Sequence, residues 1–423
     1  MQNKRFDELE GLRGVAAVIV VFYHFLLAFY LFAFLGPGQV QTRGFEDNLY
    51  GNPIMVFLSG TFAVAIFFVL SGFVLSIGFF QTGKMEIIRK LAAKRYLRLM
   101  LPALAATLIC FVIIKLGISQ LHTVAGITQS SWLAGTWLFN PDIFSALKSG
   151  IYDIFMVSGS SFNNVLWTMA YEFAGSFLVF GFIALFGKQK HRWLGYVIIS
   201  IVTFNTWFLA FVAGMVIADL YANGKLKSST RNLWYVLPFL AGSLFLAGFP
   251  LGSTEGTIYQ YLTLSAFDIQ WNAMYLTVGA IGVMMVILGT DQIGKLFRLK
   301  AVKVLGKYTF SMYLVHLIVL YTFAMAVFLF FNSNLGMSFN RSVLLTLAAS
   351  LPVIALASYF FEKYIDRPST HLASYAGNIF LGHISAEDIK VRIQTACRKY
   401  NKRIFSAYPK IMRRPVEEVE AEL

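Results

Sequence analysis

An arginine and a histidine share the first apolar segment of the chain, at a spacing that would let them act together. Arg13 opens a hydrophobic run that continues to about residue 35, and His24 lies deep inside it. On a helix, eleven steps of about 100° return to nearly the same face, with roughly 16 Å between the two side chains. Ionisable groups are costly in hydrocarbon, so a histidine at this depth indicates function. A hydrogen bond from His24 to a neighbouring helix is the alternative that this segment leaves open.

Further polar groups interrupt later apolar segments. Arg95 and Arg98 are three residues apart and share a helix face. Such a pair can grip phosphate groups bidentately, and ordinary anchoring at a membrane surface is the alternative. Glu172 begins another apolar segment, where a carboxylate usually faces a cavity or a partner. The charges at residues 362–367 are expected to be structural and to end the last apolar segment.

Tyr313 and His316 form the last candidate group. They lie partway into a later apolar segment, at a depth that resembles that of His24. Two histidines at similar depth can line one cavity, although nothing in the sequence shows that they meet. A neutral imidazole in such a place can take a proton as a general base, and a nearby hydroxyl or second imidazole can stabilise an oxyanion.

The composition identifies the class of protein that must position these groups. The chain has 423 residues, of which 57% are hydrophobic and 13% are charged, and its mean hydropathy is +0.66. These values indicate an all-α polytopic membrane protein rather than a soluble domain. Cys110 and Cys397 are too few for a disulfide framework. The histidines do not cluster with carboxylates or cysteines at ligand spacing, so we expect no metal site.

About ten apolar segments are candidate transmembrane helices. They cover residues 12–35, 54–80, 97–116, 165–187, 193–203, 204–222, 233–250, 271–290, 303–331 and 343–361. The segments rich in Lys and Arg are 81–98, 188–192, 225–231 and 295–303, and those poor in both are 36–53 and 251–270. If residues 193–222 form a hairpin that crosses twice, every basic segment and both termini lie in the cytoplasm. The net charge of +14 then reflects this asymmetry, and we expect no nucleic-acid partner.

The C-terminal tail differs in character from the rest of the chain. Residues 1–368 are expected to form one integral membrane domain, and 369–423 a basic cytoplasmic tail. Ser385 to Asp388 has the pattern of a capping box, and apolar residues then follow at helical spacing among Lys and Arg. This pattern predicts an amphipathic helix on an anionic membrane surface, with a solvated tail as the alternative.

Six short motifs together give the chain a resemblance to a known family. They are Leu12-Arg13-Gly14 with His24, Phe67 to Phe73 (Phe-Phe-Val-Leu-Ser-Gly-Phe), Arg95 with Arg98, Leu166 to Glu172, Tyr313 to His316, and Glu362 with Asp366-Arg367-Pro368. In this order, from about residue 6 to residue 368, they resemble the membrane-bound acyltransferase-3 family. Members of that family O-acylate sugars and other exported molecules in bacteria, and the family extends to fungi and animals.

The resemblance implies a chemistry for the polar groups. Acyl-CoA, commonly acetyl-CoA in this family, would donate the acyl group, and Arg13, Arg95 and Arg98 would hold its phosphates. The pantetheine arm would then run along the face shared by Arg13 and His24. His24 would act as the general base on an acceptor hydroxyl. Glu172 would orient His24 or bind the acceptor, and Tyr313 or His316 would stabilise the oxyanion. An acyl-enzyme on a histidine or on Ser71 remains an alternative.

Two other functional classes compete with this interpretation. A secondary transporter that exports a small molecule would explain midplane ionisable residues but predicts internal repeats, which are not visible. A structural or receptor-like membrane protein would leave the arginine and histidine spacings unexplained. For an O-acyltransferase, polysaccharide modification and acylation of a small exported acceptor both fit the sequence. A bacterial inner membrane and a fungal plasma or internal membrane are both compatible, and the oligomeric state stays open.

Overall fold

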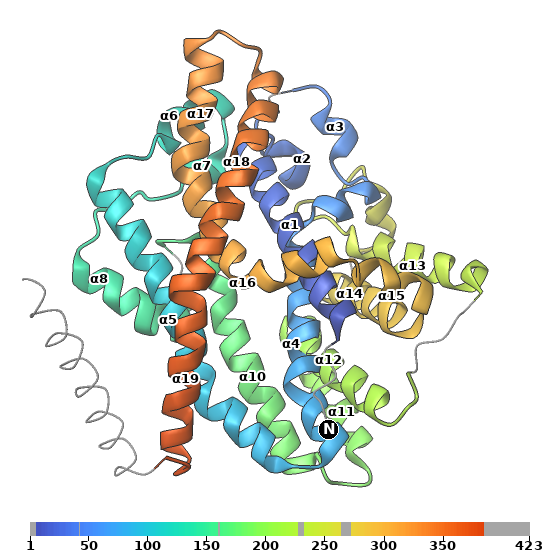
Figure 1. The fold of residues 1–423 in the computed structure, drawn as a ribbon. Helices are drawn as coiled ribbons and strands as arrows, with labels where there is room; N and C mark the ends of the chain where they lie inside the picture. Colours follow the sequence, from blue (N-terminus) through green and yellow to red (C-terminus); the bar gives the residue numbers. More distant parts are fainter. Residues whose placement is uncertain (1–5, 42, 160, 227–231, 264–271, 385–423) are drawn as a thin grey trace, which may run out of the picture.

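The computed structural model describes residues 6–41, 43–159, 161–226, 232–263 and 272–384, and within these ranges the chain is helical without a strand (Figure 1). The α-helices are α1 Asp7–Phe29, α2 Phe32–Leu35, α3 Glu46–Leu49, α4 Gly60–Thr82, α5 Met85–Leu116, α6 Leu121–Thr128, α7 Ser131–Ala134, α8 Ile143–Lys148, α9 Ile154–Met156, α10 Trp167–Phe186, α11 Arg192–Val202, α12 Phe208–Ala222, α13 Leu233–Ala247, α14 Asn272–Gly289, α15 Asp291–Phe297, α16 Lys300–Val319, α17 Met325–Leu329, α18 Phe339–Phe361 and α19 Arg367–Phe380. Short 3-10 or π turns are η1 Pro53–Leu58, η2 Ser149–Asp153, η3 Asn164–Leu166, η4 Ile258–Leu262, η6 Leu320–Ala324, η7 Phe330–Asn334 and η8 Glu362–Asp366.

Seven helical segments in the described part of the chain are long and apolar enough to cross a membrane. They are Asp7–Phe29, Gly60–Thr82, Met85–Leu116, Asn164–Phe186, Asn272–Gly289, Lys300–Asn334 and Phe339–Phe380. Three shorter apolar helices, α11, α12 and α13, fall where the other three spans were predicted. The all-α, multi-pass membrane class is therefore confirmed, whereas the cytoplasmic placement of the termini stays a prediction.

Residues 193–222 form two helices joined by a short turn, and the predicted double crossing of the membrane stays a prediction. Helices α11 and α12 are separate, and the Arg192 guanidinium at the start of α11 binds Asp219 near the end of α12. Nε and Nη2 of Arg192 donate to the two carboxylate oxygens, each at 2.7 Å. This bidentate pair joins the start of α11 to the end of α12, which is the arrangement of two antiparallel helices.

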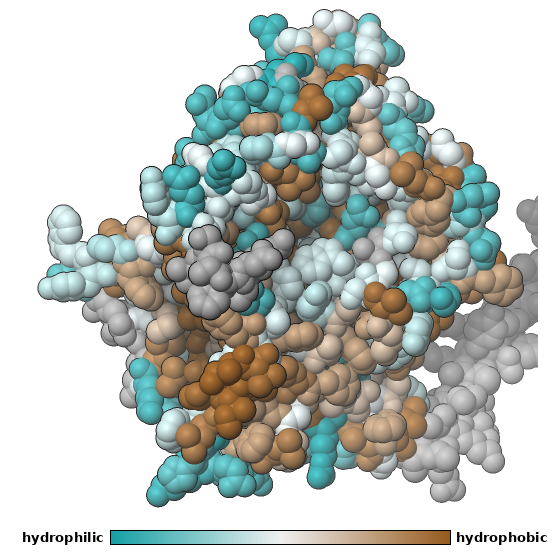
Figure 2. Space-filling view, turned by 180° about the vertical axis from the view of Figure 1, so that it is seen from behind, coloured by the Kyte–Doolittle hydropathy of each residue, from teal (hydrophilic) through white to brown (hydrophobic). Residues whose placement is uncertain are grey.

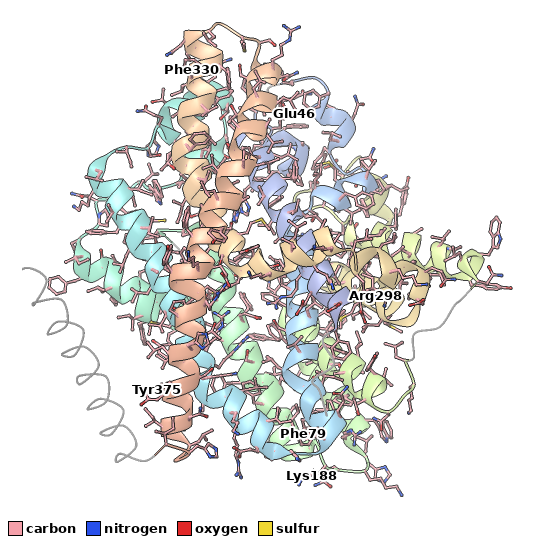
Figure 3. All side chains as sticks on the ribbon, in the orientation of Figure 1. Glu46, Phe79, Lys188, Arg298, Phe330 and Tyr375 are labelled. Carbon is pink, nitrogen blue, oxygen red and sulfur yellow. The ribbon has the colours of Figure 1, made fainter. Side chains whose placement is uncertain are left out.

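The surface separates into apolar and polar zones. Figure 2 shows apolar side chains gathered across the lower half of one face, with hydrophilic side chains above and below them. Figure 3 places Glu46 and Phe330 toward one end of the molecule and Phe79 and Lys188 toward the other. The segment poor in Lys and Arg around Glu46 and the basic turn around Lys188 therefore lie at opposite ends, as two sides of a membrane require.

Helices α1 and α16 pack closely because glycines face each other at their contact. A Cβ on Gly14 would lie 2.6 Å from the backbone nitrogen of Gly306, and a Cβ on Gly306 would collide with the carbonyl of Glu10. Small residues of this kind let helix backbones approach in a membrane. Farther along the chain, the π turn η6 separates α16, which crosses the middle of the view, from α17, which rises beside α18 (Figure 1).

Helix α19 continues the rod of α18 through the π turn η8 and lies along α5 (Figure 1). Beyond its end, His383 Nε2 lies 2.7 Å from the Glu86 carboxylate near the start of α5. Ordered helix thus extends past residue 368, where the membrane domain was predicted to end. The amphipathic helix predicted from residue 385 onward lies outside the described residues.

Candidate active site

An internal cavity of about 250 Å³ opens among five helices. It lies between α1, α4, α5, α10 and α16, and its wall is mainly apolar with a set of polar side chains. The polar residues that line it are Arg13, Ser71, Arg95, Arg98, Thr168, Glu172, Thr309 and Tyr313. The apolar residues are Val64, Phe67, Phe68, Leu70, Val74, Leu75, Leu99, Met169 and Phe310. Three arginines and one carboxylate on the wall make the cavity electropositive, which favours an anionic ligand.

Glu172 is the centre of a hydrogen-bond network on one side of this cavity. Its Oε1 accepts from the Ser71 hydroxyl at 2.5 Å and from Arg95 Nη2 at 3.1 Å. Arg95 Nε donates to the Ser176 hydroxyl at 2.7 Å, and Ser176 in turn donates to the Glu172 backbone carbonyl. The side chains of Arg95 and Glu172 are only 14% and 16% exposed. The network therefore fixes a largely buried ion pair between α5 and α10.

Arg98 is held by a different partner. Its Nη1 donates to Asp366 Oδ1 at 2.5 Å, and its guanidinium lies 5.1 Å from the centre of the Phe310 ring. Asp366 belongs to the π turn η8, which joins α18 to α19. The carboxylate of Glu362 in the same turn instead pairs with Arg367 at 2.8 Å. The end of the last long span therefore supplies an anion that positions one of the cavity arginines.

Arg13 differs from the other two arginines. Its side chain is exposed along the cavity wall, and no carboxylate lies within ion-pair distance of it in the described part of the chain. Glu172 is close enough to interact with it through space, and so are the cations of Arg95 and Arg98. An arginine whose donors are not already used can bind an anion without breaking an ion pair.

His24 and His316 meet beside this cavity. The distance between His24 Nδ1 and His316 Nε2 is 3.1 Å, and the ring centroids are 4.9 Å apart. His24 Nδ1 also lies 2.8 Å from the Val20 carbonyl oxygen, and His316 Nδ1 lies 3.0 Å from the Met312 carbonyl oxygen. His316 is 1% exposed, whereas His24 is half-buried. The two imidazoles form a hydrogen-bonded pair that is carried by the closely packed helices α1 and α16.

Tyr313 lies at the boundary between the cavity and the histidine pair. Its ring lines the cavity, and its centroid is 6.1 Å from that of His316. The Tyr313 hydroxyl lies 2.9 Å from the Val165 carbonyl oxygen and 2.8 Å from the Thr168 hydroxyl. A carbonyl oxygen only accepts hydrogen bonds, so these contacts tie the Tyr313 ring to the start of α10.

Comparisons with known proteins identify the family of the chain. A family model for an acyltransferase domain, that of the acyltransferase-3 family, matches residues 6–362. The chain belongs to the acyltransferase-3 family. O-acetyltransferase PaAT-1 from Phomopsis amygdali is 23% identical over 425 aligned residues, which cover 87% of this chain and 84% of that protein. No solved structure matches the chain. The protein is therefore an O-acyltransferase embedded in a membrane through several helices.

The acyltransferase brings five of its seven predicted site residues to one cavity. Arg13, Arg95, Arg98, Glu172 and Tyr313 all line it. The other two, His24 and His316, pair with each other and are not among its lining residues.

Two arrangements at the site differ from what we expected. Arg13 and His24 were expected to line one continuous path, but Arg13 lines the cavity and His24 does not; Tyr313, which lines the cavity, has its ring centroid 6.1 Å from that of His316. Glu172 contacts Ser71 and Arg95, and no hydrogen bond joins it to His24 in the described structure. In the described ranges, His, Cys, Asp and Glu side chains form no group of three that could hold a metal.

Several residues of the candidate site were missed by the sequence reasoning. The Trp132 ring lies over His24 with 5.7 Å between centroids, and it comes from the segment 117–164, which has few charges. Ser176 holds Arg95, and Asp366 holds Arg98. Asp366 belongs to the motif of Glu362 with Asp366-Arg367-Pro368, and we interpreted its charge as one that ends the last apolar helix. Its distance along the chain from Arg98 hid the pairing.

Proposed function

We propose that this acyltransferase moves an acyl group, most simply acetyl, from acyl-CoA to a hydroxyl of a carbohydrate or another small exported acceptor. The observation that carries the proposal is the arginine-lined cavity beside the hydrogen-bonded pair of His24 and His316. Acyl-CoA is polyanionic, and Arg13 offers free donors to its phosphates while Arg95 and Arg98 are fixed by their ion pairs. The apolar wall of the cavity suits the uncharged arm that carries the thioester.

His24 is the proposed general base. As the acceptor oxygen attacks the thioester carbon, its proton moves to His24 and a new carbon–oxygen bond forms. The carbon–sulfur bond then breaks, and the departing CoA thiolate takes the proton back from the imidazolium. The bonds and protons balance without a further reactant. Proton transfer by a positioned side chain of this kind typically contributes about 10²–10⁴-fold to the rate.

In this proposal the donor occupies the cavity and the base lies beyond its wall, where Tyr313 lines the cavity next to His316. Transfer by this route requires the thioester to pass Tyr313, whose ring is held by the Val165 carbonyl and the Thr168 hydroxyl. We therefore propose that donor binding displaces this ring. The acceptor would approach His24 from the side on which the Trp132 ring lies.

The test uses inside-out membrane vesicles that carry the full-length protein and acetyl-CoA labelled in the acetyl group. The intact protein is expected to release CoA and to place label in a glycan, lipid or small-molecule fraction. The His24→Ala variant is expected to lose both products by about 10²-fold or more. His122→Ala, which changes an exposed histidine on α6, is the matched control and should behave as the intact protein. Label transfer by His24→Ala at the full rate would contradict the role of the base.

A further inference from the structure

We infer that His316 is a positioning residue that fixes the tautomer of His24, so that Nε2 of His24 is the nitrogen that takes the proton of the acceptor. The inference rests on the proposed role of His24 as the base. It replaces an oxyanion role for His316 with a hydrogen bond that the structure shows. The argument follows from which of the four ring nitrogens must carry a proton.

The first step concerns His316. Its Nδ1 lies 3.0 Å from the Met312 carbonyl oxygen one turn earlier on α16. A carbonyl oxygen only accepts hydrogen bonds, so Nδ1 of His316 must carry the proton. In a neutral imidazole the other nitrogen then has a free lone pair. Nε2 of His316 is therefore a hydrogen-bond acceptor.

The second step concerns His24. Its Nδ1 lies 3.1 Å from that lone pair on His316 and 2.8 Å from the Val20 carbonyl oxygen. Two acceptors face this single nitrogen, so it carries the proton and donates to both. Nε2 of His24 is left with the free lone pair. One arrangement of protons therefore satisfies all three contacts, and it makes Nε2 the basic nitrogen.

The surroundings leave this task to His316. The carboxylate of Glu172 is bound to Ser71 and Arg95, and no carboxylate in the described part of the molecule bonds either imidazole. In a Ser-His-Asp triad an acid holds the imidazole in its working tautomer. Here a second, neutral imidazole has that position. His316 is 1% exposed, and its Nδ1 is bonded to the Met312 carbonyl oxygen. Water therefore has no access to Nε2 of His316 and cannot replace His24 as its hydrogen-bond donor.

The helix contact makes the arrangement rigid. Each histidine is bonded to the carbonyl four residues before it, which fixes the ring relative to its own helix. The close approach at Gly14 and Gly306 fixes α1 relative to α16. When Nε2 of His24 takes the proton of the substrate hydroxyl, Nδ1–H still donates to the Val20 carbonyl and to Nε2 of His316. The proton then leaves from Nε2 to the CoA thiolate, and His316 never changes its own protonation.

The test compares two replacements of His316 in the full-length protein. His316→Phe keeps a ring but removes the acceptor nitrogen, whereas His316→Gln offers an amide oxygen that can accept from His24 Nδ1–H. We expect kcat for acetyl transfer to fall about 10²-fold in His316→Phe and to return to within about tenfold of the intact protein in His316→Gln. The KM for acetyl-CoA should stay unchanged in both. His122→Gln serves as the control for a histidine outside the site.

A spectroscopic readout separates positioning from a merely structural effect. In protein labelled with ¹⁵N-histidine, the His24 signals are identified by their loss in His24→Ala. They should show a protonated Nδ1 and an unprotonated Nε2, and the His316→Phe variant should lose this preference. A proton on Nε2 of His24 in the intact protein would overturn the inference. If His316→Phe does not fold, the spectrum of the intact protein decides alone.

The outcomes also separate this inference from the proposed function. If the intact protein released no CoA, or if His24→Ala were fully active, the proposed function would fail. If His24 were essential but His316→Phe kept the kcat of the intact protein, the acyltransferase mechanism would stand and only the role of His316 would be wrong. Equal losses in His316→Phe and His316→Gln, with an unchanged His24 spectrum, would also contradict it.

Discussion

The arginine-lined cavity and the histidine pair are neighbours that differ in charge: ion pairs organise the cavity, whereas hydrogen bonds between uncharged groups organise the pair. Arg95 and Arg98 are held in the cavity by carboxylates from other helices, and Arg13 is left available. The histidine pair contains no formal charge partner, and its hydrogen bonds go to each other and to backbone carbonyls. Fixed charges suit recognition of a polyanion, whereas a neutral imidazole suits proton transfer.

The separation between the two regions has a chemical use. Cations of the cavity placed directly against His24 would oppose the imidazolium that forms during transfer. Tyr313 adjoins both regions, because it lines the cavity and its ring centroid is 6.1 Å from that of His316. Under the proposed function, the cavity binds the donor and the histidine pair carries out the proton transfer. Four substitutions can break or sharpen it.

The largest effect is expected where the cavity loses a fixed charge. Arg95→Ala leaves the Glu172 carboxylate buried without its cation, and removing one partner of a buried pair costs about 3–5 kcal/mol. We expect a clear loss of thermal stability in detergent and a fall in kcat/KM for acetyl-CoA of more than about 10²-fold. Arg89→Ala, at an exposed position on the same helix, should change neither. Normal stability and donor binding in Arg95→Ala would show that the ion pair does not organise the cavity.

The next effect concerns the contact that joins the histidines. Gly306→Ala places a Cβ against the Glu10 carbonyl, and overpacking of this kind costs about 1–3 kcal/mol. We expect acetyl transfer to fall about tenfold while acetyl-CoA binding is kept, because α1 shifts relative to α16. Gly181→Ala is the control, since a Cβ there has no atom within 4 Å. Undiminished transfer in Gly306→Ala would mean that the histidine geometry does not limit the rate.

A smaller effect is expected for Ser71, and it distinguishes direct transfer from an acyl-enzyme. Its hydroxyl donates to Glu172, which is itself bound to Arg95, so we interpret Ser71 as part of the network that holds the cavity. Ser71→Ala should reduce kcat/KM for acetyl-CoA only a few-fold, about the worth of one hydrogen bond. Complete loss of transfer, together with labelled acetyl on Ser71 in the intact protein, would instead establish a covalent intermediate.

The smallest effect is expected at the boundary between the two regions. Tyr313→Phe removes the hydroxyl that binds the Val165 carbonyl and frees the ring. We expect acetyl transfer to persist within a few-fold, since one neutral hydrogen bond contributes about 1 kcal/mol. CoA release without acceptor should rise, because water gains access to the thioester. A release rate equal to that of the intact protein would show that Tyr313 does not separate the regions.

Much of the fold could be predicted because its signals are local. Apolar length located the spans, and charge parity predicted the hairpin of α11 and α12, which Arg192 and Asp219 close. The position of each polar side chain within its apolar segment gave its depth, and helical periodicity gave the face that it shares with others. It could not give the neighbours of each helix, because a lipid-facing and a protein-facing apolar surface look alike in sequence.

The site shows this limit residue by residue. His24 and His316 are 292 residues apart, and equal depth suggested a shared cavity but not a hydrogen bond. Arg98 and Asp366 are 268 residues apart, so Asp366 was interpreted as a local helix-ending charge. Trp132 belongs to a segment in which no candidate site residue was predicted, and only the packing of α7 against α1 places its ring near His24.

The most direct test of the division between binding and reaction is the affinity of labelled acetyl-CoA for purified His24→Ala and Arg13→Ala. The account predicts that His24→Ala binds acetyl-CoA as tightly as the intact protein but does not turn it over. Arg13→Ala should bind it about tenfold or more weakly, because a charge-assisted hydrogen bond contributes about 1.5–3 kcal/mol. Equal loss of binding in both variants, or undiminished binding in Arg13→Ala, would contradict the division of roles between the cavity and the histidine pair.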